Sequence, residues 1–302
     1  MSIIAHFGLA LGAGTLMINE KHDSWNGQPQ PLPLAMMPQK IAILGSTGRT
    51  GRVVVKSLLE NETESYHLHL LVRSKERLEG LIPDIQFHPR VAIDEGLPND
   101  IAAVKSCLSE ASFIVCTIGT NNNEPGISMI QETASTIVAA LDELKKEGGN
   151  TWKRPRLTFL SSASLNDQFV SLRPWVLHWA VMNACNYIYT DLAVAEDILL
   201  SNKSLLTLTL VQPPLLLEGK RSDYTISETY VGPAVSYEDL GAAMAELCIV
   251  PEADGPTCAG VTSDPSGEMA SAALQGPKNL LTGFLGRMIP GYWKLHGICF
   301  GI

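Results

Sequence analysis

The stretch KIAILGSTGRTG, residues 40–51, decides the fold class of this chain of 302 residues. Residues 40–44 are mostly apolar and predict a short buried strand, and the apolar spacing over residues 52–60 predicts a helix. Glycines at positions 45, 48 and 51 lie between the two. Because glycine lacks Cβ, the backbone there can turn tightly and approach a ligand, and the helix N-terminus offers free N–H groups and a positive dipole end. The stretch therefore predicts a turn that binds the pyrophosphate of a dinucleotide.

The rest of the chain continues to alternate strands and helices. Further strands are predicted at 66–72, 85–92, 113–118, 156–160 and 206–211. Further helices are predicted at 77–81, 98–108, 127–146, 187–201 and 237–248. The strands are nearly continuous apolar runs, which suits a parallel sheet that helices cover on both faces. The pattern predicts an α/β protein, a Rossmann fold with a doubly wound parallel sheet and a small C-terminal substrate-side lobe at about residues 215–235.

Three segments are expected along the chain. Residues 1–36 are expected to be an N-terminal appendage or linker, residues 37–262 the dinucleotide-binding domain, and residues 263–302 a C-terminal tail. The apolar run 3–18 is too short to span a bilayer and no basic residue precedes it, so neither a transmembrane segment nor a secretory signal is favoured. The tail segment 280–293 is compatible with a lid, a homodimer contact or a membrane-surface element. Few cations accompany it, which makes the membrane the least favoured of the three.

Charge and cysteine content exclude several classes of protein. The net charge is −9 and no basic run is present, which argues against a nucleic-acid partner. The six cysteines are scattered, without a C-x-x-C pair or a histidine in ligand spacing. Scattered cysteines in a chain of this length indicate reduced thiols of a cytoplasmic protein, with neither a disulfide framework nor a metal site.

The end of the second predicted strand indicates which dinucleotide is bound. A site that prefers NAD(H) places an acidic residue there for the ribose 2′-hydroxyl. This chain has LVRSK at residues 71–75 instead. The guanidinium of Arg73 would attract a 2′-phosphate, which a carboxylate would repel. NADP(H) is therefore expected rather than NAD(H), and an exposed arginine without a ligand is the alternative.

Five features occur in order along the chain: GSTGRTG at 45–51, LVR at 71–73, CTIG at 116–119, FLSSAS at 159–164, and Asp191 with Glu196. They resemble the atypical short-chain dehydrogenase/reductase proteins, specifically the NmrA-like and flavin-reductase-like group. The resemblance covers roughly residues 38–262. It is strongest for fungal members, which include averufin-oxidase-like and other secondary-metabolite tailoring proteins.

The resemblance implies cofactor contacts for particular residues. The pyrophosphate would be held by Gly45, Thr47, Gly48, Arg49, Thr50 and Gly51, the 2′-phosphate by Arg73, and the ribose by Thr117, Ile118 and Gly119. Ser161 and Ser162 would lie near the nicotinamide, at the end of the strand after which this family places its active site.

The proton-transfer dyad of typical members is not found in the sequence. Those members use Tyr-x-x-x-Lys, in which the lysine lowers the pKa of the tyrosine. None of the seven tyrosines here is followed four residues later by lysine, and the positions that align with the dyad, counted back from Glu196, are Ile188 and Leu192. In a reductase, another group or water must then supply the proton. The candidates are Ser162, His178, Tyr187 and Tyr189.

Residues 169–189 are apolar and aromatic, and Pro174 is suited to begin a helix there. One helical face is expected to carry residues 175, 178, 179, 182 and 189, either as the wall of a substrate site or, equally, as part of the core. His178 is also typical of a histidine packed in the core. No G-x-S-x-G surrounds Ser161 and Ser162, so a hydrolase is excluded. Three functions remain open: an NADP(H)-dependent oxidoreductase acting on a hydrophobic small molecule, an isomerase or cyclase that retains the cofactor without net redox, and a non-catalytic NmrA-like NADP sensor. The apolar, aromatic stretch favours an enzyme over the sensor, and the oxidoreductase is the function expected.

Overall fold

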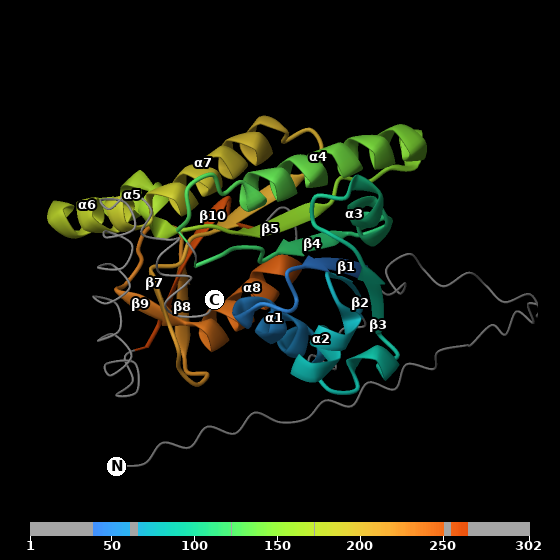
Figure 1. Cartoon of the computed structure of the whole chain (residues 1–302), viewed down its shortest axis with the longest axis horizontal. Helices are drawn as coiled ribbons and strands as arrows, with labels where there is room; N and C mark the ends of the chain where they lie inside the picture. Colours follow the sequence, from blue (N-terminus) through green and yellow to red (C-terminus); the bar gives the residue numbers. More distant parts are fainter. Residues whose placement is uncertain (1–38, 61–65, 122, 172, 251–254, 265–302) are drawn as a thin grey trace, which may run out of the picture. The chain divides into compact units, whose positions relative to one another are not determined.

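A computed structural model describes residues 39–60, 66–121, 123–171, 173–250 and 255–264 (Figure 1). The expected appendage 1–36 lies outside the described residues. So does the expected tail, apart from its first two residues, and with it the segment 280–293.

An eight-stranded sheet runs through the domain in the order β3-β2-β1-β4-β5-β6-β10-β8 (Figure 1). Its strands are β1 Gln39–Leu44, β2 Tyr66–Val72, β3 Val91–Glu95, β4 Phe113–Cys116, β5 Arg156–Leu160, β6 Thr207–Val211, β8 Tyr224–Ser227 and β10 Cys258–Ser263. All neighbours are parallel except β10 and β8. The strand order reverses between β1 and β4, and ligands of such sheets bind at the carboxyl ends of the strands at this point. The predicted doubly wound Rossmann fold is confirmed.

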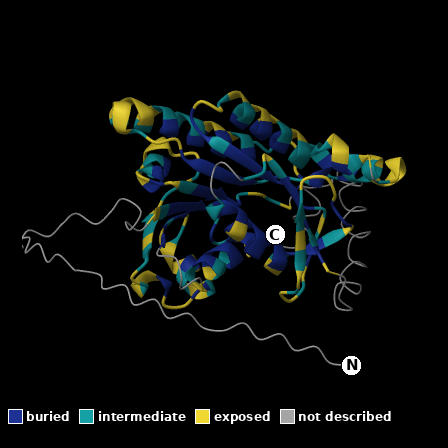
Figure 2. Cartoon of the chain, turned by 180° about the vertical axis from the view of Figure 1, so that it is seen from behind, coloured by how far each residue is buried: buried dark blue, intermediate teal, exposed yellow. Residues whose placement is uncertain are grey.

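Helices cover both faces of this sheet. One face carries α1 Arg49–Glu60, α2 Lys75–Leu81 and α8 Tyr237–Ile249, and the other carries α3 Ile101–Leu108, α4 Met129–Gly148 and α7 Asn186–Ser201. Alternate residues of β1 point to opposite faces, so that Ile41 and Ile43 pack with the first set of helices and Ala42 and Leu44 with the second. All four side chains are fully buried, and Figure 2 shows the same inner layer in dark blue. The continuous apolar strands are thus explained by burial on both sides.

Shorter elements lie between these strands and helices. They are η2 Ile85–Phe87, η3 Gly149–Thr151, η4 Ala163–Leu165, α5 Asp167–Val170, α6 Trp175–Ala184, β7 Leu215–Leu217 and β9 Ala234–Ser236. Strands β7 and β9 form a separate two-stranded parallel sheet, while β8 joins the edge of the main sheet. The segment expected to form the substrate-side lobe is therefore divided between the two sheets.

The strand predicted at 85–92 is wrong in its position. Residues 85–87 form a 3-10 turn after Asp84, whose φ of 62° is left-handed, and the strand β3 begins only at Val91. Pro89 explains the delay, because proline has no N–H for a sheet ladder and restricts the residue before it.

The single helical face expected from Trp175 to Tyr189 is also wrong, because α6 ends at Ala184 and α7 begins at Asn186. The buried side chain of Asn123 stabilises this break. Its Nδ2 donates to the Ala184 carbonyl at 2.8 Å, and its Oδ1 accepts from the backbone N–H of Tyr187 at 2.9 Å. The loop after β4 therefore fixes where α7 starts, and α7 carries Tyr189 on a helix separate from the tryptophans.

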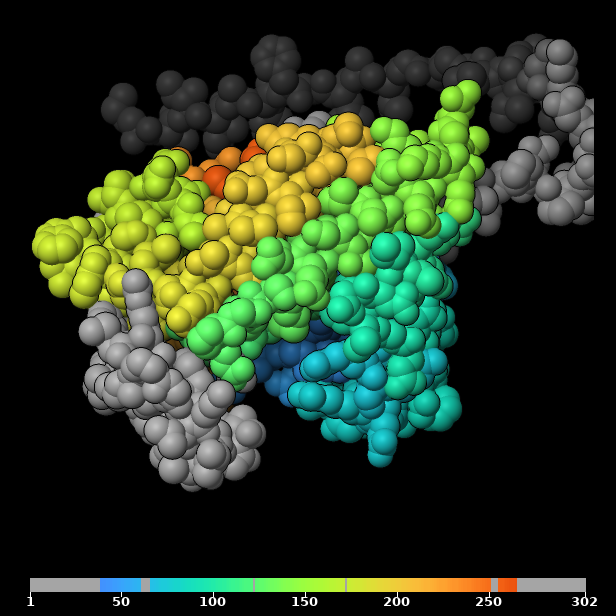
Figure 3. Space-filling model, turned by 45° about the horizontal axis from the view of Figure 1, so that its top comes forward, coloured from blue at the N-terminus to red at the C-terminus, as the bar shows by residue number. Residues whose placement is uncertain are grey.

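The N-terminus of α4 is capped by a carboxylate from α7. Asp191 is 1% exposed, and its two oxygens accept the backbone N–H groups of Ile130 and Gln131, each at 2.9 Å. These N–H groups have no partner within the helix, and a negative charge also suits the positive end of the helix dipole. The contact joins the two helices that lie side by side in Figure 3.

We expect Asp191→Ala to lower the free energy of unfolding by about 2–4 kcal/mol, because it removes two charge-assisted hydrogen bonds and leaves one buried and one half-buried donor unpaired. Urea denaturation measures the change. Asp197→Ala is the matched control, since Asp197 lies on the same helix but is exposed, and it should cost less than about 0.5 kcal/mol. Equal losses in the two variants would contradict the capping role.

Candidate functional site

The glycine turn between β1 and α1 needs glycine at two positions. Gly45 has a φ of 94°, and a Cβ added to it would lie 2.7 Å from Thr117 Oγ1. A Cβ on Gly51 would collide with the carbonyl oxygen of Gly45. The turn is closed by the Gly48 N–H, which donates to the Gly45 carbonyl at 2.9 Å. The chain thus passes over the end of β1 with no side chain between its backbone and a ligand.

The residues of this turn fit a phosphate group. The first helical N–H groups of α1 lack helical acceptors, as in every helix N-terminus, and no acidic residue lies in its first turn. Ser46 is fully buried, and its hydroxyl has no hydrogen-bond partner among the described residues. A buried hydroxyl without a partner is costly unless a ligand supplies one. Thr47 and Thr50 flank it in the same turn.

Thr117, at the end of β4, supports the turn from the neighbouring strand. Its hydroxyl lies 3.3 Å from the Leu44 carbonyl oxygen and 3.2 Å from that of Gly45. Ile118 is half-buried beside Gly45, and Gly119 is exposed with open space where a side chain would be. The three residues expected at the ribose therefore follow the strand next to the turn, with Thr117 already engaged in holding it.

Two arginines expected to bind phosphate lie differently. The Arg49 guanidinium pairs with Glu218 at 2.5 Å and stacks over the ring of Tyr237 at 5.1 Å. Both charges of the pair are largely exposed, so the ion pair is weak and a phosphate could displace it. Arg73 is exposed directly after β2, followed by Ser74, which caps α2. That is the position from which a side chain reaches a ribose 2′-substituent.

Ser161, at the end of β5, is part of a buried polar network. It is 6% exposed, and its hydroxyl donates to the carboxylate of Glu196 on α7. Glu196 also accepts from the side chain of Gln212. Burial raises the pKa of Glu196, and its two hydrogen bonds oppose that rise. The Ser161 hydroxyl therefore already has a partner and links β5 to α7.

Ser162 and Tyr189 are brought together. The Ser162 hydroxyl, just after β5, lies 3.4 Å from the phenolic oxygen of Tyr189 on α7. The hydroxyl of Ser164 also interacts with the Tyr189 phenol. Burial raises the pKa of the Tyr189 phenol, while these hydrogen bonds and the charge of Arg173 lower it. A serine and a tyrosine at the carboxyl end of a Rossmann strand can together bind and protonate an oxygen.

The other two catalytic candidates do not join this pair. Tyr187 is held through its backbone N–H by Asn123, and His178 lies on α6 with its Nδ1 buried and without a hydrogen-bond partner among the described residues. The tryptophans at 175 and 179 are 76% and 52% exposed, so core packing is wrong for them. Asn123 and Arg173 could not be identified from the sequence, because their roles follow only from contacts made in the folded chain.

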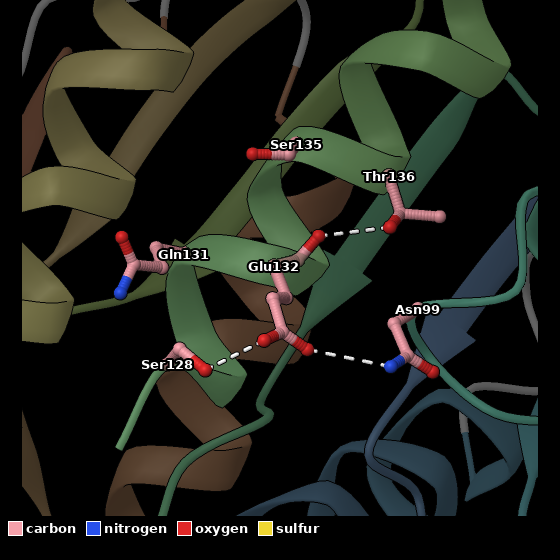
Figure 4. Close-up of a pocket in the computed structure, with 6 residues that line it drawn as sticks. All are labelled: Asn99, Ser128, Gln131, Glu132, Ser135 and Thr136. Carbon is pink, nitrogen blue, oxygen red and sulfur yellow. Dashed lines mark hydrogen bonds between the residues drawn. The ribbon is translucent and has the colours of Figure 1, made fainter. Parts of the chain in front are cut away.

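A shallow polar groove of about 550 Å³ lies along the first turns of α4 (Figure 4). It is lined by Asn99, Ser128, Gln131, Glu132, Ser135 and Thr136. Glu132 accepts from the Ser128 hydroxyl at 2.6 Å and from Asn99 Nδ2 at 3.3 Å. A polar lining of this kind does not suit the hydrophobic substrate expected from the sequence.

Neither a metal centre nor a membrane-spanning helix is found in the described ranges of the chain. The described residues contain no cluster of three or more His, Cys, Asp or Glu side chains that could hold a metal ion. None of the helices within those ranges has the length and hydropathy needed to cross a bilayer.

The strand order and the glycine turn together define a dinucleotide-binding protein of the Rossmann type. The sequence model of the NAD(P)H-binding family matches residues 45–250. The chain belongs to this family.

Curated relatives of the chain are fungal proteins named oxidoreductases. Oxidoreductase nsrR of Aspergillus novofumigatus is 32% identical over 211 residues, covering 70% of this chain and 79% of the relative. Oxidoreductase aflX of Aspergillus parasiticus is 29% identical over 261 residues, covering 86% of this chain and 96% of the relative. The predicted resemblance to this group is confirmed.

Solved structures share the fold. A short-chain dehydrogenase/reductase from Veillonella parvula in complex with NADP has a TM-score of 0.59 at 21% identity, covering 76% of this chain and 96% of that one. The oxidoreductase ylbE from Lactococcus lactis has a TM-score of 0.56 at 20% identity, covering 79% and 97%. At these identities the likeness extends to the fold alone.

Proposed function

We propose that the chain is an NADP(H)-dependent oxidoreductase that reduces a carbonyl group of a hydrophobic small molecule. The observation that carries the proposal is the contact between Ser162 Oγ and the Tyr189 phenol at 3.4 Å, beyond the carboxyl end of β5. Strand β5 lies two strands from β1 in the sheet, about 10 Å at ordinary strand spacing, so the pair lies within a dinucleotide's length of the glycine turn. Membership of the NAD(P)H-binding family and the oxidoreductase names of the relatives support it.

The side chains at the end of β5 would supply the proton in such a reaction. When bound, NADPH supplies a hydride, that is, one proton and two electrons. Ser162 donates a hydrogen bond to the substrate oxygen and orients the carbonyl. Tyr189 gives its phenolic proton to that oxygen as the carbonyl carbon becomes tetrahedral, and the phenolate takes a proton back from solvent. The products are an alcohol and NADP⁺, so atoms and electrons balance.

The substrate we infer is apolar, and the setting is fungal secondary metabolism in the cytoplasm. Helix α6 begins with exposed apolar residues, Trp175, Val176 and Leu177, next to the loop that carries Arg173. Aromatic surface of this kind suits an aromatic or polycyclic ligand. The fungal origin of the relatives supports the setting.

Arg73 is the residue we propose for the choice of NADP(H) over NAD(H). We expect Arg73→Ala to weaken NADPH binding by about 10–100-fold, because a charge-assisted bidentate contact is lost, and to leave NADH binding within about 2-fold. Calorimetric titration with each cofactor measures both. Lys56→Ala, which removes an exposed charge on α1, is the matched control and should change neither. Equal weakening of NADPH and NADH by Arg73→Ala would contradict the assignment.

The function is tested by incubating the purified protein with NADPH and a panel of aromatic ketones and quinones. We expect the absorbance of NADPH to fall in step with formation of an alcohol or hydroquinone. Product formation without NADPH consumption would instead indicate the isomerase or cyclase. Tight NADPH binding with no product from any member of the panel, and no change in metabolites on deletion of the gene, would overturn the enzyme in favour of the sensor.

A further inference from the structure

Arg173 is a half-buried cation without an anionic partner. It lies in the short loop between α5 and α6, and no carboxylate in the described part of the chain pairs with it. Its Nη1 donates to Ser164 Oγ at 3.5 Å, and its Nη2 is buried with no hydrogen-bond partner there. Withdrawing a charge from water costs free energy unless a nearby group pairs with it or hydrogen-bonds to it. The groups around Arg173 therefore indicate its role.

Ser164 joins Arg173 to Tyr189. It is 6% exposed, and its hydroxyl meets the Arg173 guanidinium on one side and the Tyr189 phenol on the other. Its backbone N–H donates to Ser162 Oγ at 3.2 Å, which fixes the two serines relative to each other. Arg173, Ser164, Tyr189 and Ser162 thus form one connected group of polar side chains, which we call the tyrosine relay.

We propose that Arg173 is a positioning residue for Tyr189 and supplies, through Ser164, the positive charge that a lysine supplies in the Tyr-x-x-x-Lys dyad. This inference rests on the proposed function. Leu192, at the position that aligns with the dyad lysine, is 6% exposed and packs in the core, so the charge must come from another element. Arginine suits the task because its guanidinium remains charged even when partly desolvated. When Tyr189 gives up its proton, the charge of Arg173 stabilises the phenolate that remains until solvent returns a proton.

The mutual electrostatic effects of Arg173 and Tyr189 on each other's pKa have the direction that this arrangement requires. Burial raises the pKa of Tyr189, and the charge of Arg173 is among the contributions that lower it. Burial lowers the pKa of Arg173, and the nearby phenol opposes this change. The pair therefore stabilises the charged forms of both groups, which is the electrostatic effect of the dyad lysine on its tyrosine.

The test needs no substrate. The protein is prepared with tyrosine that carries a heavy carbon isotope at Cζ, and the ionisation of each phenol is followed by NMR as the pH is raised. Tyr189→Phe identifies the Tyr189 signal. We expect Arg173→Gln to move the Tyr189 pKa upward by at least about 1 unit, or beyond the pH at which the protein unfolds, and Arg173→Lys to restore most of the difference. Lys153→Gln, which removes an exposed charge elsewhere on the chain, should leave the Tyr189 pKa unchanged.

Two results would overturn the inference. One is the same Tyr189 pKa in the wild type and in Arg173→Gln. The other is a wild-type Tyr189 that does not ionise before alkaline unfolding, since the cation would then fail to stabilise the phenolate. If Arg173 had a purely structural role, Arg173→Gln would change the stability of the fold, and Arg173→Lys would not restore the Tyr189 pKa. If the shift is found but the wild-type protein reduces no ketone or quinone of the panel, the tyrosine relay stands and the proposed function fails. If the wild type reduces them and Tyr189→Phe leaves turnover unchanged, only the role of Tyr189 as proton donor fails.

Discussion

Replacing Tyr189 by phenylalanine is expected to lower kcat for NADPH-dependent reduction by about 100–1,000-fold, because a positioned general acid contributes roughly that much. The Tyr189 phenol is the acidic group that touches Ser162 Oγ, at 3.4 Å. The variant keeps the ring and loses only the proton. The dissociation constant of NADPH should therefore stay within about 2-fold, since the loss falls on the transition state.

The pH dependence of kcat identifies the proton donor. A donor acts while it is protonated, so reduction is retained below its pKa and lost above it. Burial raises the pKa of Tyr189 above the ordinary 10.0, and the alkaline fall of kcat in the wild type should lie above that pH. Tyr187→Phe is the matched control and should retain activity, because Tyr187 is held through its backbone N–H. Retained activity in Tyr189→Phe, or equal loss in both variants, would show that Tyr189 is not the acid.

Replacing Gly51 by alanine is expected to weaken NADPH binding by at least about 100-fold, or roughly 2.7 kcal/mol. The added Cβ collides with the backbone carbonyl of Gly45, which no side-chain rotation can relieve, so the turn must move. Its N–H groups then no longer converge on one phosphate. Calorimetric titration of NADPH measures the loss, and circular dichroism shows whether the fold is retained.

Gly80→Ala is the control for a glycine change as such. An added Cβ at Gly80 has nothing within 4 Å, and its helical position gains about 0.5–1 kcal/mol from alanine. It should bind NADPH like the wild type. A folded Gly51→Ala protein with wild-type affinity for NADPH would contradict the assignment of the glycine turn as the pyrophosphate site.

The sheet and the glycine turn could be predicted from the sequence because their signals are local. Continuous apolar runs show burial on both faces, and glycines between a strand and a helix show a tight turn. The wrong predictions, for the third strand and for the helical face over residues 175–189, depended on single residues whose effect is set by their neighbours. Pro89 delays the third strand, and Asn123 divides the helix expected to continue from α6 into α7.

The contacts of the candidate site could be predicted only in part. Ser162 and Tyr189 were identified separately, but their contact depends on how α7 packs beside β5, across 27 residues of sequence. Arg173 carried no signal, because an arginine before a proline is typical of any surface loop. Its relation to Tyr189 exists only through Ser164, in the folded chain.

Calorimetric titration of NADPH and of NADH into the wild-type protein tests the central claim most directly, since every proposed step depends on a bound NADP(H). The account predicts one site per chain, with NADPH bound at least about 10-fold more tightly than NADH because of the 2′-phosphate. A folded protein that binds neither cofactor would contradict the account. Tighter binding of NADH would contradict the role of Arg73 and leave the glycine turn as the site of a different dinucleotide.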